Sequence, residues 1–299
     1  MKSTFIFLIF FTFYTPGKAQ EDSLLTDLLK DAPAEKSYTS SAFKGTRLIN
    51  GNTVECLGKN TLEFRVGHRF DQVSGGGETF WGLDNANMSL SLDYSFTNRL
   101  TVGIGRNSYQ KLYEGTIKYK ILRQTTNNSI PVSLVVLGKG NSLSNTKGSE
   151  YDDPVNQFSY FAEVIICRKF NKALSFQISP SIIHINLIPE QLKTNDIIAI
   201  TGSGRYKFTR SVAITAEYTQ TLNDYYYTEL ASYIPTFSAG FDLETGGHVF
   251  QLFFTNSMAL NETQYIPFTT GDWGRNQFRF GFNISRTFGF GRKTKKDSY

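Results

Sequence analysis

The side chains that could carry chemistry in this chain are mostly charged, and they recur at alternate positions of apolar stretches. Eleven are candidates for the lining of a polar interior: Glu63, Arg65, Asp93, Lys118, Lys120, Glu163, Arg205, Lys207, Glu217, Asp242 and Arg279. Arg69, Glu114, Lys169 and Glu244 share their parity. Rings of charge can select a solute in a pore. Acids and bases are nearly balanced here, which favours a salt-bridge network filling a narrow interior, because buried charges need partners.

Catalytic and metal-binding chemistry finds little support. With 2 Cys and 3 His, the chain has little material for a metal site. Ser179 and Ser181 fall on the opposite parity from His184, so no serine–histidine pair for nucleophilic catalysis is visible. We therefore expect neither an enzyme nor a cofactor.

Composition narrows the class of protein. The 299 residues are 40% hydrophobic, 15% aromatic and 19% charged, which is too apolar and aromatic for a disordered chain. The formal net charge of +5 is mildly basic and does not indicate a nucleic-acid partner. After residue 20 the chain has no run of about 18 consecutive apolar residues, so we expect no membrane-spanning helix.

The first residues are typical of an export signal. Lys2 precedes an apolar run at 5–14, and Gly17 and Ala19 place small residues where a signal peptidase cleaves. We therefore expect a signal peptide at 1–19 and a location outside the cytoplasm. An exported chain of this kind is either soluble or a barrel in the outer membrane, and the strand pattern decides between them.

The body of the chain alternates with period two. Met88, Leu90 and Leu92 share one face of a strand, and Ser89 and Ser91 share the other. About twelve such stretches follow one another, of a length that suits tilted membrane strands. They lie at 59–70, 84–96, 99–109, 113–124, 131–140, 156–170, 173–186, 197–208, 211–222, 234–244, 247–259 and 276–288.

The connections between these stretches alternate in length. Short turns such as 97–98 and 171–172 alternate with longer loops such as 71–83 and 141–155, and only 110–112 breaks the rule. This asymmetry is typical of outer-membrane barrels, with both termini on the periplasmic side. A soluble β-sandwich is the competing interpretation, but sandwich strands are usually shorter. We therefore predict an all-β, antiparallel up-and-down transmembrane barrel at 58–290.

The barrel has extensions at both ends. A periplasmic segment at 20–57 combines a short helix at 23–31 with a strand-like stretch at 42–49, and a basic tail occupies 291–299. The segment either extends into the periplasm or plugs the barrel, and we slightly favour the extension. Cys56 and Cys167 both fall near the periplasmic mouth, in an oxidising compartment, and we hypothesise a disulfide between them.

Several ordered strings resemble a known family. They lie at 43–51, 101–106, 108–111, 204–208, 241–251, 270–274 and 282–286. In these strings the chain is similar to a family of outer-membrane barrels from Bacteroidota whose function is unknown. The resemblance implies a barrel in the outer membrane. It implies no substrate and no catalytic residue.

These observations lead to one expected function and one alternative. We expect a pore or small-solute transporter, because about twelve strands leave a lumen between the filled small barrels and the open porins. Its partners would be outer-membrane lipid, the barrel-assembly machinery and a small solute. The alternative is a closed barrel that docks a partner through its N-terminal segment or its loops, where Tyr225-Tyr226-Tyr227 offers an aromatic contact surface.

Overall fold

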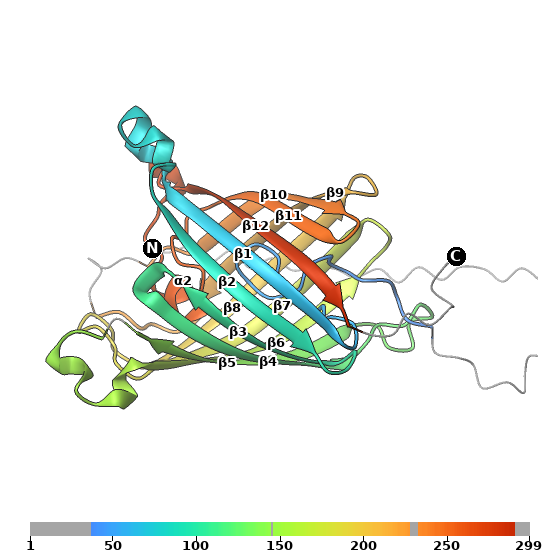
Figure 1. The fold of residues 1–299 in the computed structure, drawn as a ribbon, viewed down its shortest axis with the longest axis horizontal. Coiled ribbons are helices and arrows are strands. Elements are labelled where there is room, and N and C mark those ends of the chain that lie inside the picture. The colour runs from blue at the N-terminus through green and yellow to red at the C-terminus, as the bar shows by residue number, and fades with distance from the viewer. Residues whose placement is uncertain (1–36, 145, 228–232, 291–299) are drawn as a thin grey trace, which may run out of the picture. The chain divides into compact units, whose positions relative to one another are not determined.

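The computed structural model describes residues 37–290, except 145 and 228–232. Twelve antiparallel strands form one closed barrel, in which each strand pairs with its sequence neighbours and the last strand pairs with the first (Figure 1). The predicted fold is therefore confirmed. The expected signal peptide, the helix at 23–31 and the basic tail lie outside the described residues.

The strands coincide with the twelve predicted stretches to within a few residues. They are β1 (Thr61–Gln72), β2 (Ala86–Ser95), β3 (Leu100–Asn107), β4 (Leu112–Leu122), β5 (Ser133–Leu143), β6 (Phe158–Lys169), β7 (Leu174–Ile185), β8 (Asp196–Lys207), β9 (Val212–Thr221), β10 (Thr236–Thr245), β11 (His248–Thr255) and β12 (Arg279–Gly289).

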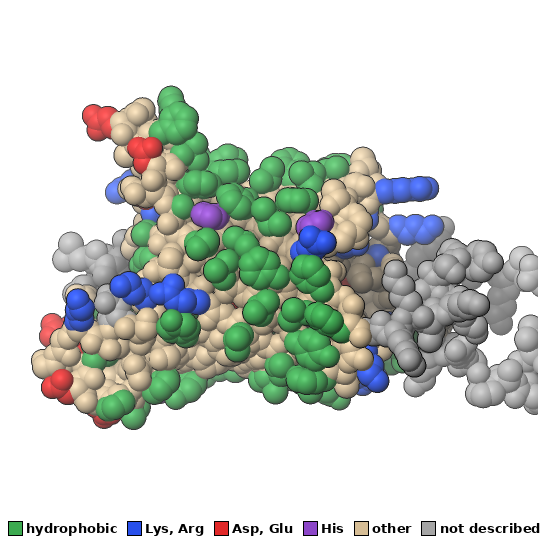
Figure 2. All heavy atoms as spheres, viewed as in Figure 1, with side chains coloured by type: hydrophobic (Ala, Val, Ile, Leu, Met, Phe, Trp, Pro, Cys, Tyr) green, Lys and Arg blue, Asp and Glu red, His purple; other side chains and the backbone are tan. Residues whose placement is uncertain are grey.

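Side-chain alternation decides which residues face the lumen. In β6 the buried positions, such as Glu163 and Ile165, alternate with exposed positions such as Val164 and Ile166. The exposed positions of the other strands are mostly apolar too, and they form a belt around the wall (Figure 2). An outward apolar band over a polar interior is the pattern of a membrane barrel, because lipid solvates only apolar side chains well.

The two ends of the barrel differ. Short turns join the strands at the end where β1 begins and β12 ends, apart from the longer connection between β4 and β5. The opposite end carries longer loops with η1 (Val73–Gly82), η2 (Tyr109–Lys111), η3 (Ser149–Tyr151), η4 (Pro154–Gln157), α2 (Glu262–Phe268) and η5 (Trp273–Arg275). None of the helices in the described ranges is long and apolar enough to cross a membrane.

Residues 37–57, hereafter the plug, run from the turn end into the barrel, where Figure 1 draws them in blue. Thr39 N donates to Gln124 O at 3.0 Å beside the turn between β4 and β5. Further in, a tight hairpin brings Thr53 N to Thr46 O at 2.9 Å. Residues 42–49 are bends and an isolated bridge, not a strand.

The favoured expectation of a periplasmic extension is wrong for residues 42–54. Most of these residues are buried, and Phe43, Leu48 and Ile49 join wall residues in one apolar cluster. Their polar groups meet carboxylates, amides and hydroxyls of the wall, which would otherwise be buried without partners. The plug alternative therefore describes this part of the chain.

Candidate functional site: the plugged lumen

The eleven predicted lumen residues occupy inward positions of the wall. Nine of them are buried: Glu63, Arg65, Lys118, Lys120, Glu163, Arg205, Glu217, Asp242 and Arg279. Asp93 and Lys207 are partly exposed. The strand register places these side chains on many different strands, so the plug meets a ring of polar groups instead of one cluster. The role of this ring depends on the hydrogen bonds and ion pairs that it forms with the plug.

The tip of the plug, Asn50-Gly51-Asn52, is held by the wall. Glu217 on β9 accepts hydrogen bonds from the backbone N–H of Asn50 at 3.2 Å and of Gly51 at 3.0 and 3.2 Å. The Asn50 side chain donates to Ser238 Oγ at 2.8 Å. A Cβ at Gly51 would stand only 3.2 Å from the Glu217 carboxylate. Glycine at the tip therefore lets a buried carboxylate reach the backbone directly.

The far side of the tip is held by amide and carboxylate groups. Gln177 on β7 donates to Asn52 O at 2.7 Å and accepts from Val54 N at 3.2 Å, so one side chain satisfies both backbone groups. Asn52 Nδ2 donates to Glu163 at 3.2 Å and to Glu262 at 2.9 Å. Glu262 belongs to α2, in the loop between β11 and β12. The plug thus contacts both the wall and a loop from the opposite end.

Four ionised groups form a compact network beside the hairpin. Arg47 lies 3.1 Å from Glu114 and 3.6 Å from Glu262. Lys139 lies 2.6 Å from Glu262 and 3.8 Å from Glu114. Burial opposes the charge of Arg47, but the nearby acidic groups, Glu262 and Glu114 foremost, together raise the pKa of the guanidinium. Two acids therefore balance two bases in a place where an unpaired charge would be costly.

The loop at 256–278, hereafter the cap loop, closes the lumen from the other end. Asn261 caps α2, and six of the seven residues of the helix are buried. Tyr225 and Tyr226 both donate hydrogen bonds to Pro267 O, at 3.2 and 2.6 Å. The expectation that this tyrosine cluster is a contact surface is wrong for these two residues, because their hydroxyls satisfy the end of α2. Only Tyr227 is well exposed.

The turn end of the lumen is basic. Lys120 lies 3.3 Å from Glu55, and Lys169 Nζ donates to Ser40 Oγ at 2.7 Å. Glu244 forms ion pairs with both Arg205 and Lys207. Beside these groups is a cavity of about 690 Å³, hereafter the basic mouth. Its charged lining consists of Lys44, Lys169, Lys172, Arg205, Lys207, Arg210 and Glu244.

The hypothesised disulfide is wrong. Both cysteines lie in the described part of the chain and both are free thiols. Cys56 Sγ lies 3.7 Å from Arg99 O, beside the turn between β2 and β3. Cys167 belongs to β6 and is buried in the apolar cluster with Val54. Placing two residues at one end of a barrel does not bring them together: Cys56 lies in the plug beside the turn between β2 and β3, and Cys167 lies on β6.

Three residues of the ionised network escaped the sequence pattern. Lys139 follows Val135 and Leu137 on the inward face of β5, but both faces of that strand contain apolar residues, which hides the alternation. Glu262 follows an Asn that caps a helix, a signal present in the sequence. Arg47 has no local signal, because its partners are far away along the chain. The sequence pattern describes the strands of the wall and leaves out the residues that fill the lumen.

The lumen has a polar lining, and the plug and the cap loop close it. Carboxylates, ammonium groups and amides line it, and they would hydrate if the plug and the cap loop withdrew. Ser179 and Ser181 face the lumen, whereas His184 is partly exposed on the outer side and pairs with Asp196 at 2.7 Å. Ser179 and Ser181 therefore lie on the opposite face of the wall from His184.

Comparison with solved structures gives barrels of low sequence identity. The NanC porin matches with a TM-score of 0.48 and 12% identity, over 77% of this chain and 100% of that one. The KdgM porin has a TM-score of 0.48 and 12% identity, over 76% and 99%. An outer-membrane channel from Pseudomonas putida F1 has a TM-score of 0.44 and 13% identity, over 79% and 98%.

Two comparisons use sequence alone. None of the curated proteins matches the chain. A family model described as a membrane-bound beta barrel domain, DUF5777, matches residues 43–288, which include most of the plug and nearly all of the wall. The chain therefore belongs to this family of membrane-bound β-barrels.

Proposed function

We propose that this protein is a gated pore for a small polar solute in the outer membrane, and that the plug is its gate. One observation carries the proposal: the plug is held in a charged lumen by side chains of the wall, and not by strand pairing. Among the described residues, its only backbone bridge to the wall is Tyr38 with Thr125, at the turn end. The ladder of the wall closes without the plug.

The contacts of the plug suit a reversible closure. Each hydrogen bond between the plug and Glu217, Gln177 or Glu163 replaces a contact that water could make in an open lumen, so its net free energy is small. A set of such contacts can hold a closed state within a few kcal/mol of an open one. The lining that holds the plug would then face the solute, as charged rings do in selective pores.

A permanently closed barrel is the second candidate. The observation that favours it is that the cap loop fills the other end, with Glu262 bonded to both the plug and Lys139. In that case the barrel would conduct no solute and would act by docking a partner. Neither candidate is an enzyme. In both, we propose that the protein comes from Bacteroidota, is inserted by the barrel-assembly machinery and contacts outer-membrane lipid.

Single-channel recording of the full chain in a planar bilayer tests the proposal. We expect the wild type to open rarely. Replacing Glu217 with Leu removes the acceptor for two buried N–H groups and should raise the open probability about tenfold or more, at ~1–3 kcal/mol for each unsatisfied group. Thr219→Val is the matched control, because Thr219 faces the lumen on the same strand and bonds Thr201 instead of the plug.

The outcomes separate the two candidates. Openings that become frequent in Glu217→Leu and stay rare in Thr219→Val support a gated pore. A silent Glu217→Leu variant whose folded barrel still shifts on a gel after heating would support the permanently closed barrel.

A further inference from the structure

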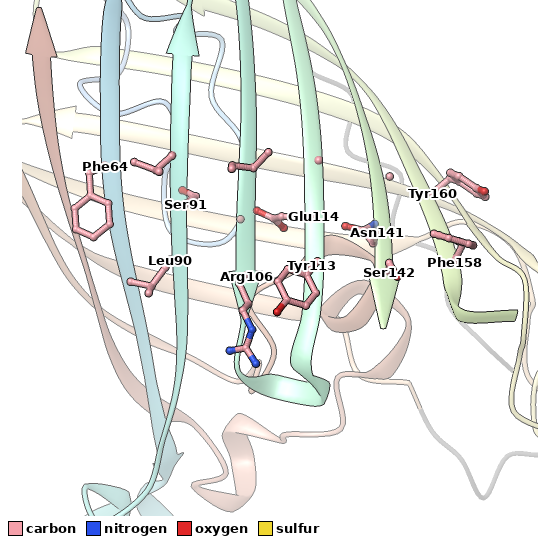
Figure 3. A pocket seen from close by; sticks show the side chains of 15 residues that line it. Phe64, Leu90, Ser91, Arg106, Tyr113, Glu114, Asn141, Ser142, Phe158 and Tyr160 are labelled. Carbon is pink, nitrogen blue, oxygen red and sulfur yellow. The ribbon is translucent and has the colours of Figure 1, made fainter. Parts of the chain in front are cut away.

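The outer face of the wall has a groove between β2 and β6. Its volume is about 800 Å³, within the usual range for ligand pockets of ~300–1,000 Å³. Figure 3 shows Phe64 and Leu90 on one side of it and Phe158 and Tyr160 on the other. Arg106 and Tyr113 lie between them, toward the turn between β3 and β4.

Two glycines on the outer face, Gly115 and Gly140, open the groove. Gly115 pairs with Gly140 across β4 and β5, between Ile104 of β3 and Tyr160 of β6 in the same cross-strand row. The bulky neighbours stand on both sides of this glycine strip, so the belt of apolar side chains is interrupted there.

In the part of the chain that the structure describes, no close contact requires glycine at position 115 or 140. An added Cβ at Gly140 would meet no atom within 4 Å, and one at Gly115 would meet only Gly140 O at 4.0 Å. Neither residue has the positive φ that favours glycine. Glycine also weakens a strand. The space is therefore not filled or needed by the protein itself, which points to an occupant from outside the chain.

Charge identifies one end of that occupant. Arg106 is exposed on the outer face, with its guanidinium 5.3 Å from the centre of the Tyr113 ring. Among the described residues, no carboxylate lies within 4 Å of this guanidinium. An arginine on the lipid-facing side is costly in the hydrocarbon and tolerated near the interface. It lies in the second-last position of β3, beside the loop end, where lipid headgroups would be.

We propose that the groove binds one anionic, phosphate-bearing membrane lipid, with an acyl chain over Gly115 and Gly140 and its phosphate on Arg106. The outer face of a membrane-bound barrel is surrounded by lipid, so an acyl chain is the apolar occupant at hand. Guanidinium binds phosphate oxygens through two parallel hydrogen bonds. This site does not depend on the lumen being a pore.

Native mass spectrometry of the full chain in detergent tests the site. The probes are dimyristoyl phosphatidylglycerol and dimyristoyl phosphatidylcholine, which share their acyl chains and differ in net headgroup charge. We expect the wild type to retain one phosphatidylglycerol in preference to phosphatidylcholine. Arg106→Gln should weaken retention of phosphatidylglycerol about tenfold and abolish the preference, because it removes a charge-assisted bond. Gly140→Phe should weaken retention of both lipids by filling the groove.

Two control variants make the same changes elsewhere on the outer face. Arg286→Gln removes an exposed arginine that also lies over an aromatic ring, 4.9 Å from the centre of Phe288. Ala216→Phe adds bulk to an exposed position of β9. Both should retain lipid as the wild type does.

Several results would overturn the assignment. One is equal retention of the two lipids by the wild type. Others are a Gly140→Phe variant that binds as the wild type does, or a loss in Ala216→Phe as large as in Gly140→Phe. A groove that instead joins two copies of the chain would show as a dimer lost in Gly140→Phe with lipid retention unchanged. Gel mobility before and after heating confirms that each variant is folded.

Discussion

The carboxylate of Glu217 accepts the backbone N–H of Gly51 at 3.0 and 3.2 Å, which links β9 to the tip of the plug. The two residues are 166 positions apart in the chain. Both are almost fully shielded from solvent, and Glu217 is 1% exposed. Because backbone N–H groups of the plug bond the buried Glu217 carboxylate, water can hydrate this carboxylate only if the tip of the plug leaves. The pair is therefore a local measure of whether the plug is in place.

Weakening this pair should expose a native thiol. Cys167 faces the lumen and is 1% exposed under the plug. In a Cys56→Ser background, a charged, water-soluble thiol reagent should modify Cys167 slowly. Adding Glu217→Leu should raise the rate about tenfold, because two donors at the tip lose their acceptor at ~1–3 kcal/mol each. An unchanged rate, with the same reagent reacting fully after denaturation, would mean that Glu217 does not hold the plug.

The wall was predictable because its information is local. Strands such as β6 and β9 separate inward from outward side chains within ten or so residues, and the parity of Glu163 and Glu217 follows directly. The alternation of short turns and longer loops then predicts an up-and-down order of the strands, without any information on long-range contacts. The same reasoning placed Arg205 and Asp242 on the inner face, where they form an ion pair at 3.5 Å.

The contents of the lumen were not predictable in this way. The sequence of the plug shows no periodic pattern, and its polar groups bond partners on eight strands and the cap loop. Arg47 and Asn52 look like ordinary loop residues until Glu114, Glu163 and Glu262 are placed around them. The disulfide hypothesis failed for a related reason, since parity gives the depth of Cys167 and not its position around the barrel.

The ionised network should couple the plug to the cap loop. Arg47 and Glu262 lie 3.6 Å apart, and both contact further charges. A double-mutant cycle with Arg47→Met and Glu262→Gln should give an interaction free energy of ~0.5–3 kcal/mol in the free energy of unfolding. A second cycle that combines Arg47→Met with Glu244→Gln should be additive, because Glu244 pairs with Arg205 and Lys207 instead. Additivity in both cycles would show that the network carries no coupling.

The basic mouth predicts an anion preference for the proposed pore. Lys44, Lys172 and Arg210 line it and are exposed, while Glu244 is its only acidic lining residue. A mouth of one sign concentrates the opposite ion. In a KCl gradient, the reversal potential of the open Glu217→Leu variant should therefore favour chloride.

Neutralising the mouth provides the control for this prediction. Adding Lys44→Gln, Lys172→Gln and Arg210→Gln should move the reversal potential toward zero. The same change at Lys111 and Lys147, which lie beyond the strands at the loop end, should move it less. A larger shift from the loop-end pair would place the selective region at the other end of the barrel.

The thiol count follows from the observed positions of the cysteines. Cys56 contacts Arg99 O, and Cys167 is enclosed by the apolar cluster around Val54. Denatured protein should therefore give the same count of two thiols with and without prior reductant. A count that rises after reduction would mean that the two residues approach each other in a state other than this one.

Close packing against Phe253 should make the stability of the barrel sensitive to substitution of one wall glycine, Gly281. A Cβ at Gly281 on β12 would stand 2.4 Å from the Phe253 ring and 2.8 Å from His68 O. Phe253 cannot yield easily, since its ring also supports the buried Arg69 guanidinium at 4.3 Å, which donates to Ile49 O of the plug. Gly281→Ala should therefore lower the free energy of unfolding by ~1–3 kcal/mol, the usual cost of overpacking.

Gly140→Ala is the matched change, because its added methyl group meets no atom within 4 Å. It should leave the free energy of unfolding unchanged or raise it slightly, since alanine loses less conformational entropy than glycine on folding. Urea unfolding of both variants in the same detergent provides the measurement. If the two variants were equally stable, Phe253 would have room to move, and the wall would not hold Arg69 against the plug as tightly as the contacts indicate.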